Sequence, residues 1–130
     1  MKYISTRNKN KVVSSSEAII QGLAEDGGLY TPQSLDQKVD LSSTLKMNYL
    51  ELAQYILSLF LSDFSHEQIQ QCVQNAYQNS FENNEVAPLY KYHDGWLMEL
   101  WHGPTSAFKD VALTLLPHLL TAAYQNQNEN

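Results

Sequence analysis

The residue best suited to carry chemistry in this sequence is Lys109, within LWHGPTSAFKDVA, residues 100–112. A neutral lysine amine is a nucleophile that joins aldehydes as a Schiff base. An apolar helical pattern begins near Ala107, so Lys109 is predicted to lie at the N-terminal end of a helix. The positive end of a helix disfavours an ammonium ion, and burial acts in the same direction. The position therefore permits Schiff-base chemistry at Lys109.

The neighbouring Asp110 acts the other way, because a nearby carboxylate stabilises a cation. A helical offset of about 100° per residue is expected to turn the two side chains apart. The plain alternative is that Lys109 is an ordinary solvated lysine near a helix end. Spacing and periodicity alone leave both interpretations open.

Three helices are predicted before the lysine segment. Residues 14–17 form a capping box, and the helix behind it is expected to end at Gly27-Gly28. Residues 48–61 are apolar on nearly all sides, which predicts a helix buried on most faces. Residues 65–68 form a second capping box, followed by a single apolar stripe at helical spacing. The stripe, which should face the core, is formed by Ile69, Cys72, Val73, Ala76 and Tyr77.

Strand patterns occur at both ends of the chain. Residues 2–7 predict a short strand, and residues 29–32 are expected to be extended. Residues 89–93 and 96–101 flank Asp94-Gly95, a pair that favours the tight turn of a β-hairpin. The expected fold is therefore an α/β fragment of α+β character, with helices, a short strand and one hairpin.

The last helix carries Lys109 near its start and is predicted to begin near Ala107. Asp110 is expected on its wetter face, and Pro117 is expected to kink it by removing a backbone hydrogen bond. The helix should bury a stripe formed by Phe108, Val111, Ala112, Leu115, Leu119 and Ala123.

Composition limits the classes of protein to consider. The chain has 130 residues, 43% of them hydrophobic, which suits one small domain or a piece of a larger one. A net charge of −6 with eight Lys and Arg residues argues against nucleic acid as a partner. Cys72 is the only cysteine, so no disulfide and no cysteine-based zinc site is expected. No segment predicts a membrane partner or a signal peptide, which makes the cytoplasm the expected compartment.

The segment ELWHGPTSAFKD, residues 99–110, closely resembles the lysine-bearing segment of threonine synthases. Two further blocks agree with that family in order and spacing: YISTR at residues 3–7 and GLAEDGGLYTP at residues 22–32. Residues 33–87 contain little that is diagnostic of the family. The resemblance therefore covers both ends of the chain.

The resemblance implies an enzyme dependent on pyridoxal phosphate, of fold type II. Threonine synthases convert O-phospho-L-homoserine, their small-molecule substrate, and water to L-threonine and phosphate. Lys109 would hold the cofactor through a Schiff base and, once freed, act as the base at the substrate carbons. Residues 1–87 would form the N-terminal domain of such an enzyme. Residues 88–130 would begin its cofactor-binding catalytic domain and end after the lysine helix.

The same resemblance implies supporting roles for four residues just before Lys109. Gly103 and Pro104 would shape the turn that aims Lys109. Thr105 and Ser106 would contact cofactor or substrate through hydroxyl or backbone groups, with stabilisation of the turn as the alternative. No metal ligands and no particular oligomeric state are implied.

The chain departs from the family in length, because threonine synthases have several hundred residues. None of its five glycines follows Lys109, so the glycine-rich loop that binds the cofactor phosphate is expected outside this sequence. The 130-residue chain alone is therefore predicted to be inactive. Two alternatives stay open: a related phospholyase that acts on another phosphorylated amino acid, and a non-catalytic binding or assembly module.

Overall fold

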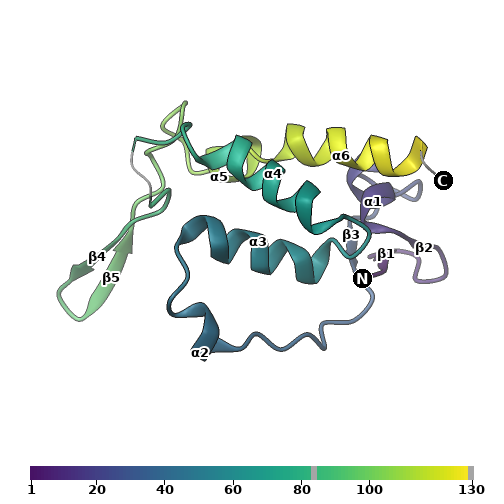
Figure 1. The fold of residues 1–130 in the computed structure, drawn as a ribbon. Helices are drawn as coiled ribbons and strands as arrows, with labels where there is room; N and C mark the ends of the chain where they lie inside the picture. Colours follow the sequence, from purple (N-terminus) through teal and green to yellow (C-terminus); the bar gives the residue numbers. More distant parts are fainter. Residues whose placement is uncertain (83–84, 129–130) are drawn as a thin grey trace.

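The first part of the chain folds into a three-stranded antiparallel sheet with the strand order β2-β1-β3. The fold comes from a computed structural model that describes residues 1–82 and 85–128. Both predicted extended segments of this region are strands, which confirms them (Figure 1). The strands are β1 (Tyr3–Ser5), β2 (Val12–Val13) and β3 (Tyr30–Pro32).

Helix α1 (Ser15–Gln21) begins at the predicted capping box. The Ser14 hydroxyl accepts from the Glu17 N–H at 3.1 Å, and a Glu17 carboxylate oxygen accepts from the Ser14 N–H at 2.7 Å. The predicted end at Gly27-Gly28 is wrong, because α1 stops at Gly22. Gly22 has a φ of +67°, a left-handed conformation that ends the helix and that other residues rarely adopt.

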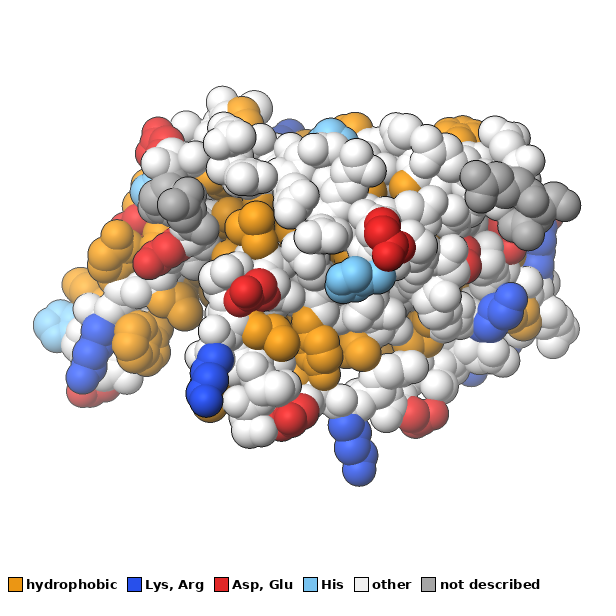
Figure 2. All heavy atoms as spheres, viewed as in Figure 1, with side chains coloured by type: hydrophobic (Ala, Val, Ile, Leu, Met, Phe, Trp, Pro, Cys, Tyr) orange, Lys and Arg blue, Asp and Glu red, His pale blue; other side chains and the backbone are white. Residues whose placement is uncertain are grey.

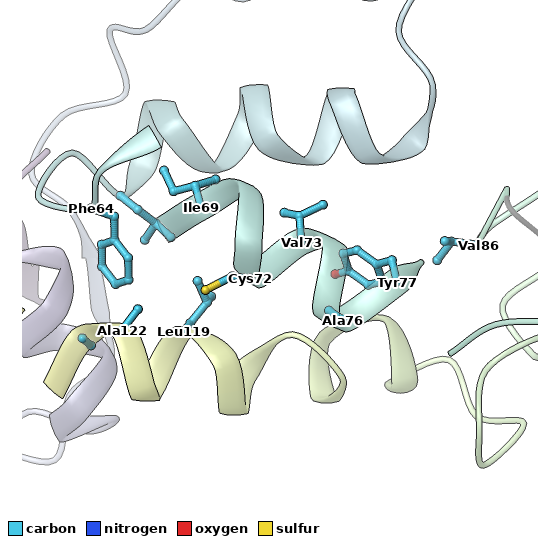
Figure 3. Packing of buried hydrophobic residues seen from close by; sticks show 11 residues of the cluster. Phe64, Ile69, Cys72, Val73, Ala76, Tyr77, Val86, Leu119 and Ala122 are labelled. Carbon is cyan, nitrogen blue, oxygen red and sulfur yellow. The ribbon is translucent and has the colours of Figure 1, made fainter. Parts of the chain in front are cut away.

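Three helices build most of the core. Helix α4 (His66–Tyr77) lies between α3 (Tyr49–Phe60) and α6 (Leu116–Asn128), as Figure 3 shows. All five residues of the predicted α4 stripe are buried, which confirms it. Cys72 is thus a core thiol, and burial raises its pKa.

Helix α3 is less buried than its sequence predicts. No residue of α3 is fully buried, although Tyr49, Leu50, Ala53 and Leu57 pack against the core cluster. The prediction of burial on most faces is therefore wrong: one side of α3 covers α4, and Glu51 and Leu52 lie on its exposed side. The chain reaches α3 through a short helix that the sequence did not predict, α2 (Leu41–Thr44), capped by Asp40.

The predicted hairpin is present as β4 (Leu89–Tyr92) and β5 (Gly95–Met98). Its turn lies one residue earlier than predicted, because Gly95 pairs with Tyr92 and leaves His93 and Asp94 at the turn. His93 supplies the positive φ, +49°, that was expected of the Asp94-Gly95 pair. All residues of both strands are exposed, and hydrophobic side chains cover the hairpin at the left of Figure 2.

The predicted lysine helix is divided into α5 (Asp110–Leu113) and α6. Pro117 lies in the first turn of α6, where a missing N–H is tolerated, and the predicted helix is interrupted just before it, between Leu113 and Leu116. Three burial predictions are also wrong: Phe108 is 74% exposed and Ala112 is exposed as well, whereas Asp110 is only 3% exposed. The α6 residues Leu119, Ala122 and Ala123 are buried.

Helix α6 connects the end of the chain to its beginning by packing against α1 and α4. The Asn126 side chain donates to the Ser16 hydroxyl at 3.2 Å and to the Asp63 carbonyl at 3.0 Å. It also accepts from the Gln68 side chain at 2.7 Å. The lysine segment is therefore fixed to the helical core from its C-terminal side. Of the helices described, none has the length and apolar character needed to cross a membrane.

Candidate functional site

Lys109 lies directly before α5 with an exposed side chain. Within residues 1–82 and 85–128, its amine makes no hydrogen bond or ion pair. Its backbone carbonyl accepts from the N–H groups of Ala112 and Leu113 at 3.0 and 2.9 Å, which starts the helix. The long helix predicted directly behind Lys109 is therefore absent, because α5 is a single turn of four residues.

The loop that presents Lys109 is closed by the carboxylate of Asp110. One oxygen accepts from the Thr105 hydroxyl at 2.5 Å, and the other accepts from the Thr105 N–H at 2.7 Å. The second oxygen also receives a longer contact of 3.5 Å from the Ala107 N–H. The Thr105 hydroxyl bond contributes most to lowering the pKa of Asp110, and the Lys109 charge contributes least. The predicted separation of the Lys109 and Asp110 side chains agrees with this geometry.

Gly103 makes the close approach of Asp110 possible. A Cβ atom at position 103 would lie 2.5 Å from the Cβ of Asp110, much closer than two carbon atoms can pack. The loop is tightened further by the Ser106 N–H, which donates to the Gly103 carbonyl at 3.1 Å. Ser106 has a φ of +55°, which is uncommon for a residue other than glycine. The sequence HGPTSAFKD thus encodes a compact loop with Lys109 at its end.

The two other predicted site residues differ in what they contact. The Thr105 hydroxyl is bonded to Asp110 and so stabilises the turn, which was the alternative considered for it. The Ser106 side chain is exposed. Lys109, Thr105 and Ser106 lie together on this one loop, and contact of Thr105 or Ser106 with a cofactor stays a prediction.

His102 joins the start of the loop to the segment after α4. Its Nε2 lies 2.6 Å from a Glu99 oxygen, and its Nδ1 lies 3.1 Å from a Glu82 oxygen. The Glu82 N–H also donates to the His102 carbonyl at 3.0 Å. These two carboxylates, Glu99 first, raise the pKa of His102 above its usual value. The sequence did not reveal this cluster, because Glu82 is distant in sequence and carries no motif.

The raised pKa of His102 predicts a pH-dependent contribution to stability. The unfolded histidine titrates at about pH 6.5, so the stabilisation is complete below that pH and is lost as the pH rises through the folded pKa. We expect the gap in unfolding free energy between wild type and His102→Gln to shrink from about pH 5 to about pH 8. Urea unfolding at several pH values measures this gap, and a gap that stays constant with pH would contradict a stabilising role for the contacts of His102 with Glu99 and Glu82.

A second network orders the N-terminal turn. One Asp26 oxygen accepts from the Ser5 hydroxyl at 2.7 Å and from the Gly28 N–H at 2.8 Å, which lowers the pKa of Asp26. Arg7 donates to the Asp26 carbonyl at 3.1 Å. These contacts tie β1 to the turn before β3. Across the part of the chain that the structure describes, no group of three His, Cys, Asp or Glu side chains could hold a metal ion.

These features define a small α+β domain in which an apolar hairpin and an exposed lysine loop come before the last two helices. The family described as threonine synthase N terminus matches residues 2–77, and the chain belongs to this family. The predicted resemblance to threonine synthase is therefore confirmed. The family match ends before the lysine segment, so the role of Lys109 stays a prediction.

Individual relatives extend the similarity over nearly the whole chain. The threonine synthase of Methylobacillus glycogenes is 36% identical over 99% of this chain, which spans 30% of that protein. The threonine synthase of Saccharomyces cerevisiae is 36% identical over 98% of the chain, which spans 27% of that protein. Human threonine synthase-like 1 is 34% identical over 90% of the chain, which spans 18% of its length. The chain thus spans less than a third of each of these relatives.

Solved structures share the fold. The threonine synthase from Brucella melitensis with bound pyridoxal phosphate superposes with a TM-score of 0.90 at 35% identity, over 98% of this chain and 28% of that one. The yeast threonine synthase superposes with a TM-score of 0.85 at 36% identity, over 99% of this chain and 27% of that one. The mixture of helices and small sheets matches the corresponding region of these enzymes, which confirms the predicted fold class.

Proposed function

We propose that this chain is the N-terminal part of a threonine synthase. The full-length protein would convert O-phospho-L-homoserine and water to L-threonine and phosphate, with pyridoxal phosphate as cofactor. The observation that carries the proposal is the exposed, unengaged amine of Lys109 at the end of an ordered loop, in a chain of this family.

The residues present fit the cofactor. The amine of Lys109 is accessible and has no protein partner among the described residues, so it is free to react with an aldehyde. When bound, pyridoxal phosphate supplies that aldehyde together with a ring that withdraws electrons from the substrate carbon. Thr105 and Ser106 are the proposed cofactor contacts on the same loop.

Lys109 is the proposed catalytic residue. Lys109 would hold the cofactor through its Nζ, and the same Nζ, when free, would accept the proton from the substrate Cα and serve the proton transfers at Cβ. One amine that performs successive proton transfers must hold a fixed position within hydrogen-bond reach of both carbons. The compact loop from Gly103 to Asp110 fixes the backbone from which the Lys109 side chain extends.

The proposed division of the chain places the N-terminal domain at residues 1–87 and the start of the catalytic domain at residues 88–130. The hairpin supports this boundary, because an apolar hairpin exposed on both faces suits the beginning of a larger sheet. Helix α6, which belongs to the second part of this proposed division, packs on α1 and α4 of the first part. The cytoplasm is the proposed compartment.

The 130-residue chain alone is expected to show no turnover of O-phospho-L-homoserine. Gly103 is the last of the five glycines, so the sequence contains no glycine-rich loop after Lys109 that could bind the cofactor phosphate. Phosphate release should be measured for the purified chain and for the full-length protein under identical conditions. Turnover by the purified short chain would refute the prediction.

A second candidate function is a threonine-synthase-like phospholyase that uses Lys109 on another phosphorylated amino acid. The relatives include proteins named threonine synthase-like 1, such as the human protein at 34% identity, so similarity to the family does not by itself select the substrate. A panel of phosphorylated amino acids, tested on the full-length protein, separates the two substrates. The reading frame after Asn130 separates both enzymes from a binding module: continued coding supports an enzyme, and a stop codon supports the module.

A further inference from the structure

The carboxylate of Asp110 is buried next to an exposed lysine. Its side chain is 3% exposed, and both oxygens accept hydrogen bonds from the loop before Lys109. A buried carboxylate is costly unless such partners satisfy it. The Asp110 carboxylate is therefore buried because it holds this loop in its folded shape. The chemistry proposed for Lys109 does not use this carboxylate.

We propose that Asp110 is the positioning residue of Lys109: it folds the loop from Gly103 to Ala107 against the start of α5 and thereby fixes where the lysine amine emerges. This inference rests on the proposed function of Lys109. Asp110 acts through the loop and not by contact with the substrate.

The geometry restricts the loop on both sides of Lys109. On the N-terminal side, the Thr105 N–H and hydroxyl are held by Asp110 at 2.7 and 2.5 Å. On the C-terminal side, the Asp110 carbonyl accepts from the Thr114 N–H at 3.0 Å and from the Thr114 hydroxyl at 2.8 Å. Asp110 thus links the loop to the helix through its side chain and its backbone, and Lys109 lies between these two attachments.

Gly103 provides independent support for the inference. A methyl group at position 103 would meet the Asp110 Cβ at 2.5 Å and one carboxylate oxygen at 2.7 Å. A Gly103→Ala substitution must therefore move the Asp110 side chain or open the loop. The two substitutions Asp110→Ala and Gly103→Ala should produce the same defect by different routes.

A displaced lysine is expected to react much more slowly. A misplacement of about 1 Å costs on the order of 100-fold in reactions that depend on orientation. Asp110→Asn separates geometry from charge, because its amide oxygen can still accept the two N–H groups while its NH₂ group donates to the Thr105 hydroxyl. If Asp110 acts through geometry, asparagine should restore most of what alanine removes.

The matched control is Asp40→Ala. Asp40 also accepts from a following N–H and hydroxyl, those of Ser42 at 3.0 and 2.7 Å, but it caps α2. In Figure 1, α2 lies at the lower edge of the molecule and α5 near its upper edge. The control therefore removes the same kind of contact far from the lysine loop.

The test uses the full-length protein without cofactor, at a temperature where every variant is folded by circular dichroism. Pyridoxal phosphate is added at one fixed concentration, the adduct is trapped with borohydride at several times, and peptide mapping gives the labelled fraction of Lys109. Amide exchange at Thr105 and Ala107 is measured on the same proteins.

For Asp110→Ala and Gly103→Ala we expect labelling slowed by about 10-fold or more and faster exchange at Thr105. Asp110→Asn and Asp40→Ala should label within about 3-fold of wild type. Wild-type labelling rates in the two alanine variants, or an asparagine variant as slow as Asp110→Ala, would overturn the positioning role. If Lys109 is not labelled even in the wild type, the proposed function of Lys109 is refuted. The test thus distinguishes failure of that function from failure of the positioning role of Asp110.

Discussion

Replacing Lys109 with alanine in the full-length protein is expected to reduce phosphate release from O-phospho-L-homoserine by about 100- to 10,000-fold. The substitution removes both the amine that holds the cofactor and the base that serves the substrate carbons. The loop should keep its shape, because its contacts come from Asp110 and Thr105 and not from the lysine side chain. Steady-state phosphate release at saturating cofactor measures the effect.

Lys46→Ala is the matched control for this prediction. Lys46 is an exposed lysine just before α3, and it belongs to none of the networks around the lysine loop. Its rate should stay within about 2-fold of wild type, since exposed surface substitutions rarely matter. Equal rates for Lys109→Ala and Lys46→Ala would show that Lys109 is an ordinary surface lysine.

The largest effect on stability is expected from Ile69→Ala. The Ile69 side chain is 2% exposed in the core cluster of α4, where shortening it leaves a cavity (Figure 3). Such substitutions cost about 2 to 5 kcal/mol, against a total of about 5 to 15 kcal/mol for a typical domain. Urea unfolding of the 130-residue chain should show the loss as a lower midpoint with little change in slope.

Leu45→Ala provides the comparison, because Leu45 is 84% exposed. Its unfolding free energy should change by no more than about 0.5 kcal/mol. Ile69→Val should lie between the two, at about 0.5 to 1.5 kcal/mol. If Ile69→Ala proved as mild as Leu45→Ala, the packing of α4 between α3 and α6 would be wrong.

Elements encoded by local sequence were predicted correctly. The capping boxes that start α1 and α4 each involve side chains three residues apart, and both form in the structure. The buried stripe of α4 follows directly from helical periodicity. These features depend on contacts within one helix or with one face of the core, so the sequence pattern contains them.

Features that depend on chain geometry were harder to predict. Periodicity placed Asp110 on the wetter face of a long helix, but the helix starts at Asp110 itself, and the preceding loop folds back to cover the carboxylate. The burial of Asp110 depends on its close contact with Gly103, which is seven residues earlier. This contact exists only in the folded chain, so the sequence pattern did not reveal it. The sequence predicted that Pro117 would disturb a helix. It did not predict that a new helix, α6, begins one residue before this proline.

Contacts between segments that are distant in the sequence could not be predicted from any sequence pattern. The His102 cluster depends on Glu82, which lies twenty residues earlier in an otherwise unremarkable stretch. The attachment of α6 to α1 depends on Asn126, more than a hundred residues from Ser16. The lysine motif was recognised from its local sequence, whereas the contacts that support it had to come from the structure.

The central claim is that Lys109 binds pyridoxal phosphate covalently in the full-length protein. The most direct measurement is the visible absorption spectrum with added cofactor, for wild type and Lys109→Ala, followed by borohydride reduction and peptide mapping. We predict a visible band in the wild type that is absent from Lys109→Ala, and a reduced adduct on Lys109. A wild type without the band, or a band that persists unchanged in Lys109→Ala, would contradict the account and favour a non-catalytic module.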